Sequence, residues 1–164
     1  MEIDFKKLLT KKEDLTPIDR TNPYNVLAML VHTLCNYNPT DTNNFYEMLS
    51  YLLGEYQPVS SIMKQNIQDR MLQNDKYDFI GYSYFKDTTP ENDYKIDNYI
   101  ISIEEDTKSK EEGYIRLLLK SSGADSKRTV TLRLAKDGIY YIWSDSFMGL
   151  LADIRPPEST NPWK

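Results

Sequence analysis

Two residues of the sequence, His32 and Cys35, are of types that take part in nucleophilic and metal chemistry. They lie three positions apart, so a helix places them on one face. Such a pair can serve as a nucleophile with its base, or as two ligands of a metal ion. Zinc needs at least two further ligands, and the chain has no second His or Cys. Because both residues lie in the most apolar segment, we interpret them as buried and inert, and we expect no metal site.

A polar cluster in the segment KSSGADSKR, residues 120–128, is a second candidate. Lys127 and Arg128 could hold an anion, while Gly123 permits a positive φ and Asp125 can accept hydrogen bonds from nearby backbone amides. The segment is not a P-loop, because the pattern Gly-x-x-x-x-Gly-Lys-Ser/Thr is absent. Two strands of matched pattern flank it and need a connection. We therefore favour a plain turn, with an anion site as the alternative.

Carboxylates form the third group, since they could act in acid–base catalysis. Asp145 and Asp153 adjoin aromatic or apolar residues near the end of an expected sheet. Pairing with a nearby arginine such as Arg155 would more often give a structural ion pair than a catalytic one. The acidic pairs at 104–105 and 111–112 flank a charged loop and are expected to be solvated. We therefore predict no catalytic residue.

Aromatic residues gather in two short segments, YDFIGYSYF (77–85) and IYYIWSDSF (139–147). Large aromatic side chains usually serve cores, and core packing is the simpler interpretation. If the exposed members converge, they form a surface that binds peptides, sugars or small planar molecules. The sequence then predicts a ligand-binding surface composed of Tyr82, Tyr84, Phe85, Asp125, Arg128, Trp143 and Asp145.

The composition of the 164-residue chain limits the class of partner. Hydrophobic residues make up 40% and charged residues 27%, as in ordinary globular proteins, although thirteen tyrosines are unusual. The net charge is −5, and basic residues alternate with acidic ones in KKLLTKKED and EEDTKSKEE. A nucleic-acid-binding domain would carry a clustered positive stripe, so we expect no nucleic-acid partner.

Several features of the chain favour a cytoplasmic setting. The start MEIDFKKLLTKKED lacks the apolar region of a secretory signal, and a single cysteine allows no internal disulfide. The longest apolar run, VLAMLV, is too short to span a bilayer, so we expect no membrane insertion. A piece of a longer, anchored protein would have the same features.

The first half of the chain has helical patterns. Asn22 or Thr21 can cap a helix with Pro23 at its first position, and Pro39 ends that helix near residue 37. Gly54 is suited to follow the end of a second helix. The apolar spacing predicts helices over residues 22–37, 41–54 and 60–73.

The second half has strand patterns. After an aromatic segment with a short strand or irregular piece near 79–85, β-branched and aromatic runs separated by turn residues predict strands in YIISIEE, GYIRLLLKS, RTVTLRLA and IYYIWS. Asp137-Gly138 favours a two-residue type I′ turn that pairs residues 130–135 with 139–144. Alternation places six aliphatic residues on one buried face: Ile115, Leu117, Leu119, Val130, Leu132 and Leu134.

Helices followed by strands indicate one α+β domain, in which a layer of about three N-terminal helices packs on a C-terminal antiparallel meander of three to five strands. Its expected parts are an N-terminal extension (1–20), the helical part (21–74), an aromatic segment and loop (75–97), the sheet (98–146) and a tail (147–164).

Five segments resemble a family of bacterial domains of unknown function: NPYNVLAMLVHTLC, SYFKDTTPENDY, EEGYIRLLLKSSGADSKRTVTLR, DGIYYIW and LLADIRPPESTNPW. The resemblance covers residues 21–163 and implies no activity and no catalytic residues, because the family has none assigned. More loosely, three long strands backed by helices resemble cystatin-like or NTF2-like domains. That fold often holds a small-ligand pocket between helix and curved sheet, which is an argument by analogy.

These observations favour a non-catalytic binding or interaction domain without a cofactor, whose partner is a protein or small molecule of unknown identity. The alternative is an NTF2-like small-ligand-binding or enzymatic domain that uses Asp145 or His32 in a pocket between helices and sheet. A third class, a subunit of a larger assembly, would expose an apolar patch on one face.

Overall fold

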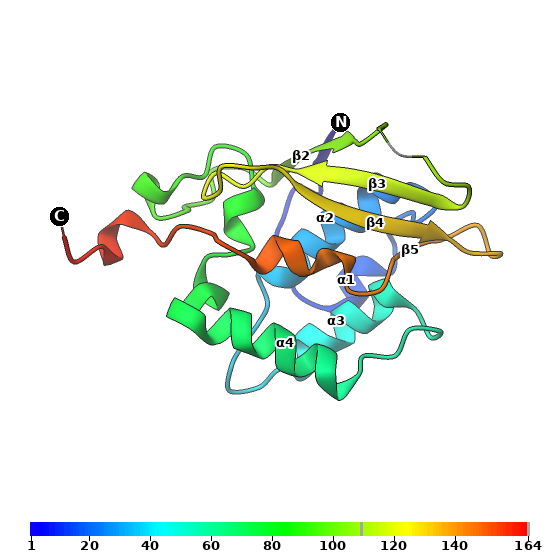
Figure 1. The fold of residues 1–164 in the computed structure, drawn as a ribbon, viewed down its shortest axis with the longest axis horizontal. Coiled ribbons are helices and arrows are strands. Elements are labelled where there is room, and N and C mark those ends of the chain that lie inside the picture. The colour runs from blue at the N-terminus through cyan, green and yellow to red at the C-terminus, as the bar shows by residue number, and fades with distance from the viewer. Residues whose placement is uncertain (109, 164) are drawn as a thin grey trace.

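The computed structural model describes residues 1–108 and 110–163 of the chain. Within them, four α-helices precede most of a five-stranded sheet, which confirms the predicted α+β class (Figure 1). The helices are α1 (Lys12–Leu15), α2 (Pro23–Leu34), α3 (Asn43–Leu53) and α4 (Ser61–Leu72). The strands are β1 (Glu2–Asp4), β2 (Ile100–Glu105), β3 (Tyr114–Leu119), β4 (Arg128–Leu134) and β5 (Tyr140–Ile142).

The three longer helices lie where their sequence signals predict. The side chain of Asn22 accepts a hydrogen bond from the Tyr24 amide and caps α2, with Pro23 in its first turn. Gly54 follows α3 with φ of 84°, a conformation that suits a residue without a Cβ atom. Ser60 caps α4 by accepting from the Met63 amide.

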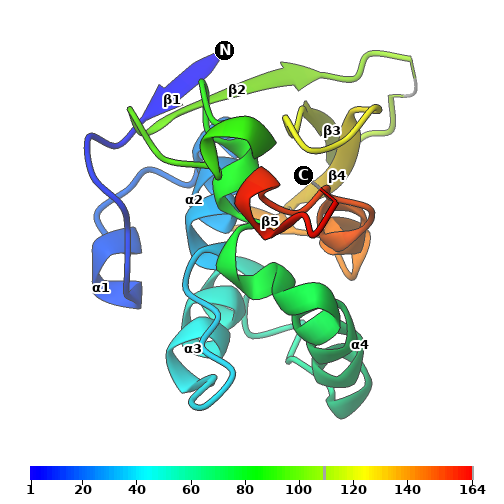
Figure 2. The same cartoon turned by 90° about the vertical axis from the view of Figure 1, so that its left-hand side faces the viewer.

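Helix α2 is the centre of the molecule. All nine of its residues from Val26 to Leu34 are buried. It runs beneath the sheet, while α3 and α4 lie farther from the strands (Figures 1 and 2). A helix that is apolar on several sides needs partners on several sides, and the sheet and α3 provide them.

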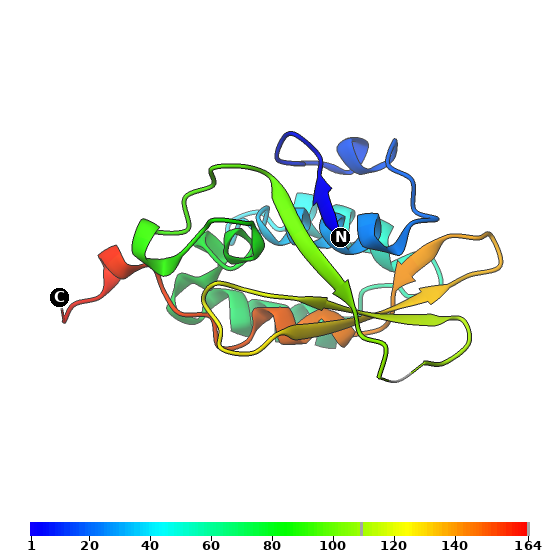
Figure 3. The same cartoon turned by 90° about the horizontal axis from the view of Figure 1, so that it is seen from above.

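The sheet is antiparallel throughout, with the strand order β1-β2-β3-β4-β5. Strands β2 to β5 form the predicted meander, and β2 crosses the helices at a steep angle to β3 and β4 (Figure 3). Residues 1–20, which we expected to be an extension, contribute β1 and α1. Glu2 pairs with Ser102, so β1 adds a strand to the outer side of β2.

The inner face of the sheet confirms most of the predicted alternation. Leu117, Val130 and Leu132 are fully buried, Leu119 is nearly so, and Ile115 is only partly buried. The prediction was wrong for Leu134, whose exposed fraction is 40%. Leu134 lies at the end of β4, where the hairpin extends beyond the helices that cover the rest of the face (Figure 3).

The β4–β5 hairpin has the predicted pairing but a different turn. Leu132 lies opposite Ile142 and Leu134 opposite Tyr140, as expected. The type I′ turn was wrong, because Gly138 has a positive φ of 82° and Asp137 does not. The amide of Gly138 donates to Ala135 O, and the amide of Ala135 donates to Ile139 O. The loop therefore has three residues, a type I turn followed by a left-handed glycine.

The segment between the helices and the sheet is a series of short 3-10 helices, η1 (Gln73–Asp78), η2 (Tyr82–Tyr84) and η3 (Pro90–Asn92). Residues 79–85, where a short strand or irregular piece was expected, contain η2. The tail contains η4 (Ser146–Leu151) and η5 (Glu158–Thr160). None of the helices in the described ranges is long and apolar enough to cross a membrane.

Candidate functional site

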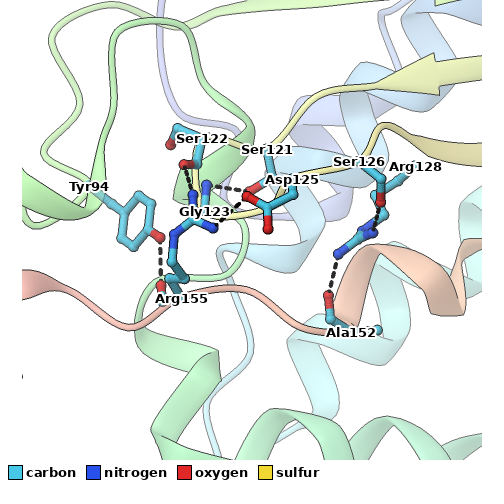
Figure 4. A network of polar contacts seen from close by, with 9 residues as sticks. All are labelled: Tyr94, Ser121, Ser122, Gly123, Asp125, Ser126, Arg128, Ala152 and Arg155. Atoms are coloured by element: carbon cyan, nitrogen blue, oxygen red, sulfur yellow. Dashed lines mark hydrogen bonds and ion pairs between the residues drawn. The ribbon is translucent and has the colours of Figure 1, made fainter.

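The turn at residues 121–127 makes its polar contacts with the C-terminal tail of the same chain (Figure 4). Gly123 accepts a hydrogen bond from the Arg155 amide at 2.9 Å, and Asp125 forms an ion pair with the Arg155 guanidinium at 2.9 Å. Tyr94 donates its hydroxyl proton to the Arg155 carbonyl oxygen at 2.5 Å. We call these contacts between the 121–127 turn and the tail the clasp. Gly123 and Asp125 of this turn are thus engaged with the tail, although the Asp125 side chain stays exposed to solvent.

Buried hydrogen bonds anchor the clasp to the core. The Ser121 hydroxyl donates to the Ser83 hydroxyl at 2.7 Å, and the Ser122 amide donates to Ser83 O at 3.0 Å. On the other side, Arg128 donates to the Ser126 hydroxyl at 2.8 Å and to Ala152 O at 2.9 Å (Figure 4). The arginine that was predicted to bind a ligand therefore ties β4 to the tail.

The aromatic residues of the η2 region are largely internal. Tyr84 is buried, and its hydroxyl donates to Leu150 O at 2.5 Å; burial raises the pKa of this phenol. Phe85 is buried against the imidazole of His32 at a ring-centroid distance of 5.0 Å. Tyr82 is half-buried.

His32 is a structural residue of α2. Its Nδ1 accepts a hydrogen bond from the Leu9 amide at 3.0 Å, so the neutral ring carries its proton on Nε2. Nε2 has no hydrogen-bond partner within the described ranges. Burial lowers the pKa of His32 to about 4, so the ring is neutral at physiological pH. In this neutral state, the Nδ1 atom of His32 binds the backbone amide of Leu9 and so fixes the segment that follows β1 to α2.

Cys35 lies at the end of α2 and does not act with His32. Its thiol donates to Val31 O at 3.5 Å, and burial raises the pKa of the thiol. A thiol with a raised pKa is a poor nucleophile at neutral pH. No group of three or more His, Cys, Asp or Glu side chains is placed to hold a metal ion in residues 1–108 and 110–163.

An open groove lies at the opposite end of the sheet from the clasp, between the loop after α3 and the β4–β5 hairpin. Its volume is about 680 Å³. One wall is the loop 54–57 and the other is formed by the hairpin, including Leu134, Tyr141 and Trp143. We call this hollow the outer groove. A second hollow of about 510 Å³ lies on the far side of the same loop and shares Gly54 with it.

The loop that forms the outer groove is fixed to the edge strand. Gln57 donates to Leu53 O and Ile142 O, both at 2.8 Å, and accepts from the Ser144 amide at 2.7 Å. Gly54 lies against the ring of Tyr141, so close that a Cβ atom would come within 2.7 Å of ring carbons. The groove is therefore preformed by the packing of the loop on β5.

Arg133 lies on the outer face of β4 at the border of the groove. Its guanidinium carbon is 4.6 Å from the ring centroid of Trp143 and 5.1 Å from that of Tyr114. The two rings pack edge to face with centroids 5.7 Å apart. On the far side of Trp143, a hollow of about 190 Å³ is lined by Arg116, among others.

Charges of both signs line the outer groove. Arg133 and Lys136 are opposed by Glu55 and Asp137. The Ile139 amide and the Tyr141 hydroxyl donate to the carboxylate of Asp137, and these hydrogen bonds lower its pKa. The Asp137 carboxylate is therefore already engaged by the hairpin.

The structure does not bring the predicted ligand-binding residues together. Tyr82, Tyr84 and Phe85 belong to the η2 region, whereas Asp125 belongs to the clasp and Arg128 to the start of β4 beside it. Trp143 lies in the outer groove. Asp145 is exposed just before η4, and its side chain makes no cap hydrogen bond.

Sequence reasoning missed the residues that accompany Trp143 in the groove, Tyr56, Gln57, Arg133 and Tyr141, and Tyr114, which packs against Trp143 beside it. A signal existed for part of this set. The predicted pairing of 130–135 with 139–144 already places Arg133 opposite Tyr141, as observed. No comparable signal links the loop 54–57 with the hairpin.

Comparison with known families adds one finding. Residues 7–158 match a family described as Domain of unknown function (DUF6935). The chain belongs to this family. The membership confirms the resemblance to an uncharacterised domain family over nearly the whole chain. No curated protein and no solved structure matches the sequence, and the likeness to cystatin-like or NTF2-like domains remains a prediction.

Proposed function

We propose that this member of the DUF6935 family is a non-catalytic binding domain whose ligand occupies the outer groove. The observation that carries the proposal is the groove of about 680 Å³ with Tyr56, Tyr141 and Trp143 in its lining. Preformed hollows of roughly 300–1,000 Å³ with aromatic walls and a few polar groups are the usual sites of small ligands. Tyr56 is 90% exposed, so its ring is available to a ligand.

The state of the other candidate sites supports this choice. The clasp uses its hydrogen-bonding groups on the tail, and His32 is enclosed between Phe5 and Phe85. The space between α2 and the sheet is occupied by fully buried side chains such as Leu30, Leu117 and Leu132. An NTF2-like pocket would need open space there, with a titratable group facing it.

The scattered positions of the exposed apolar residues favour a local binding site over a broad surface for assembly with other subunits. In the described ranges, the large ones are spread over the first residue, the 54–57 loop, α4, β4 and the tail: Met1, Tyr56, Ile62, Leu72, Leu134 and Trp163. Only two of them, Tyr56 and Leu134, share one surface feature, the outer groove.

A fragment screen by NMR tests the proposal. Mixtures of small aromatic and aliphatic compounds are added to the ¹⁵N-labelled protein, and backbone amide shifts are followed. We expect the responding amides to cluster in residues 54–57 and 133–143. The chain's two tryptophans supply matched variants, because Trp143 lines the groove and Trp163 is 90% exposed in the tail.

The variant W143A should abolish the shifts, whereas W163A should leave them unchanged. Shifts that cluster instead around Tyr84 and Arg128 would move the site to the clasp end and contradict the proposal. The same contradiction follows if no fragment perturbs the groove at millimolar concentration.

A further inference from the structure

We infer that the ligand of the outer groove carries an oxyanion, a carboxylate or a phosphate, which Arg133 binds, joined to an apolar ring that packs against Trp143. This inference rests on the proposed function, because it names the ligand class of the same site. Two observations support it: the guanidinium of Arg133 stacks on two aromatic rings, and its N–H donors have no hydrogen-bond partner within the described residues.

The side chain of Arg133 is held by stacking, and its guanidinium N–H groups take no part. The register places it on the outer face of the sheet, opposite Tyr114 on β3 and Tyr141 on β5. Its guanidinium lies over the rings of Trp143 and Tyr114 at 4.6 and 5.1 Å. Stacking on aromatic faces orients the plane of a guanidinium and leaves its edge of donors open.

The donors of Arg133 have no partner within the described ranges. The five ion pairs there involve other residues, and no side-chain hydrogen bond includes Arg133. Three other arginines differ: Arg155 binds Asp125, Arg128 binds Ala152 O, and Arg20 donates to Tyr51 O at 3.4 Å. An unpaired surface arginine is common, but one held by two rings at the border of a preformed groove is already arranged for a planar oxyanion.

Two further basic residues lie near Arg133. Arg116, also without an ion pair in the described ranges, lines the small hollow on the far side of Trp143 together with Glu111, and Lys136 lines the outer groove together with Glu55 and Asp137. Of these acids, Asp137 is engaged by the Ile139 amide and the Tyr141 hydroxyl. A carboxylate or phosphate can accept two parallel hydrogen bonds from one guanidinium, which fixes its orientation.

The groove beside Arg133 suits an apolar group. Leu134 is 40% exposed within it, and Tyr56 and Trp143 add aromatic surface. An aromatic ring packed against Trp143 would bury part of that side chain, while its anionic substituent reaches the guanidinium stacked on the same tryptophan. The two contacts together predict that neither the ring nor the anion alone binds as well as their combination.

Fluorescence titration of the variant W163F tests the inference, because Trp143 is then the only tryptophan. The probes are benzoate, phenyl phosphate, benzyl alcohol and inorganic phosphate. We expect benzoate or phenyl phosphate to change the Trp143 emission, and the preferred one identifies the oxyanion. Benzyl alcohol and inorganic phosphate should each bind at least about tenfold more weakly, because one contact is missing.

Arginine variants made in the W163F background separate charge from geometry. R133Q should weaken binding about tenfold or more, R133K should lose most of the same affinity because an ammonium lacks the planar fork, and R70Q is the matched control. Arg70 is exposed on α4, away from the groove, and its removal should change nothing. Thermal melts within a few degrees of each other confirm that the variants are folded.

Three results would overturn the inference: equal binding of benzyl alcohol and benzoate, unchanged affinity in R133Q, or no binding of either anionic ring at millimolar concentration. If neutral fragments still bind in the groove, the proposed function stands and only the anionic ligand class fails. If inorganic phosphate matches phenyl phosphate, the ring contact is wrong.

Discussion

The side-chain amide of Gln57 lies against the main chain of Ile142 and donates to its carbonyl oxygen at 2.8 Å. The same nitrogen donates to Leu53 O, and the amide oxygen accepts from the Ser144 amide. Farther along the same strand, the Tyr140 amide donates to Arg20 O at 3.0 Å. Side-chain and loop contacts thus occupy part of the exposed edge of β5 and protect it from pairing with another chain.

We predict that Q57E destabilises the protein by about 2 kcal/mol at pH 7, more than Q57A, which should cost about 1 kcal/mol. The glutamate has almost the same shape, but it places carboxylate oxygen against the carbonyl oxygens of Leu53 and Ile142. Urea unfolding measures the difference. Q68E, on the exposed surface of α4, is the control and should be neutral. Equal stabilities of Q57E and the unchanged protein would contradict the role of Gln57.

The pH dependence of stability should report His32. The unfolded chain takes up a proton near pH 6.5, whereas the folded protein does so only near pH 4, because burial lowers the His32 pKa. Protons therefore bind the unfolded state preferentially between these values, and the free energy of unfolding falls as the pH falls. The full loss is about 3 kcal/mol, at 1.36 kcal/mol for each pH unit.

The variant H32F isolates this effect. It should be less stable at pH 7 by about 1–3 kcal/mol, because the Leu9 amide loses its acceptor. Its stability should then change much less between pH 6.5 and 4.5, a range above the pKa of most carboxylates. Denaturant unfolding at several pH values gives both quantities. Parallel curves for the two proteins would show that His32 is not responsible.

Gly123 should tolerate no side chain. A Cβ atom there would collide with the Tyr94 hydroxyl and lie 2.8 Å from Cγ2 of Ile154, so G123A should cost about 1–3 kcal/mol. It should also speed amide hydrogen exchange at Arg155, which donates to Gly123 O. Gly149 has open space around its position, and G149A is the matched control. Slow exchange at Arg155 in G123A would argue against the clasp.

Truncation to alanine of two leucines of β4 should lower the free energy of unfolding by very different amounts. Leu132 is fully buried, and L132A should cost about 2–5 kcal/mol through the cavity that it leaves. Leu134 is two residues further on the same face but 40% exposed, so L134A should cost less than about 1 kcal/mol. Thermal and urea unfolding measure both. Similar costs would mean that the helices cover the hairpin end.

Much of the fold could be predicted because its signals are local. Asn22, Pro23 and Gly54 mark helix ends, and the alternation around Leu117 and Leu132 sets the inner face of the sheet. The turn at Asp137-Gly138 was predicted in the right place but with the wrong geometry. Only the glycine takes a positive φ, and the sequence pair cannot distinguish a two-residue from a three-residue loop.

The site could be predicted only in part, because its walls come from distant segments. Gln57 and Ile142 are 85 residues apart, and no local pattern joins them. Tyr84 and Phe85 have the composition of a binding surface, but the compact turns of η2 direct them into the core. The alternation along β4 places Arg133 on the face opposite to Leu132, but its stacking on Trp143 depends on the hairpin register.

The pairing of Glu2 with Ser102 sets an order for events on the ribosome. Strand β1 is synthesised before its partner β2, which follows about a hundred residues later in the chain. Until then, Ile3, which becomes buried, has no partner strand beside it. Closure of so distant a pair is entropically costly, so we expect the pairing of β1 with β2 to form more slowly than the local pairing of β3 with β4.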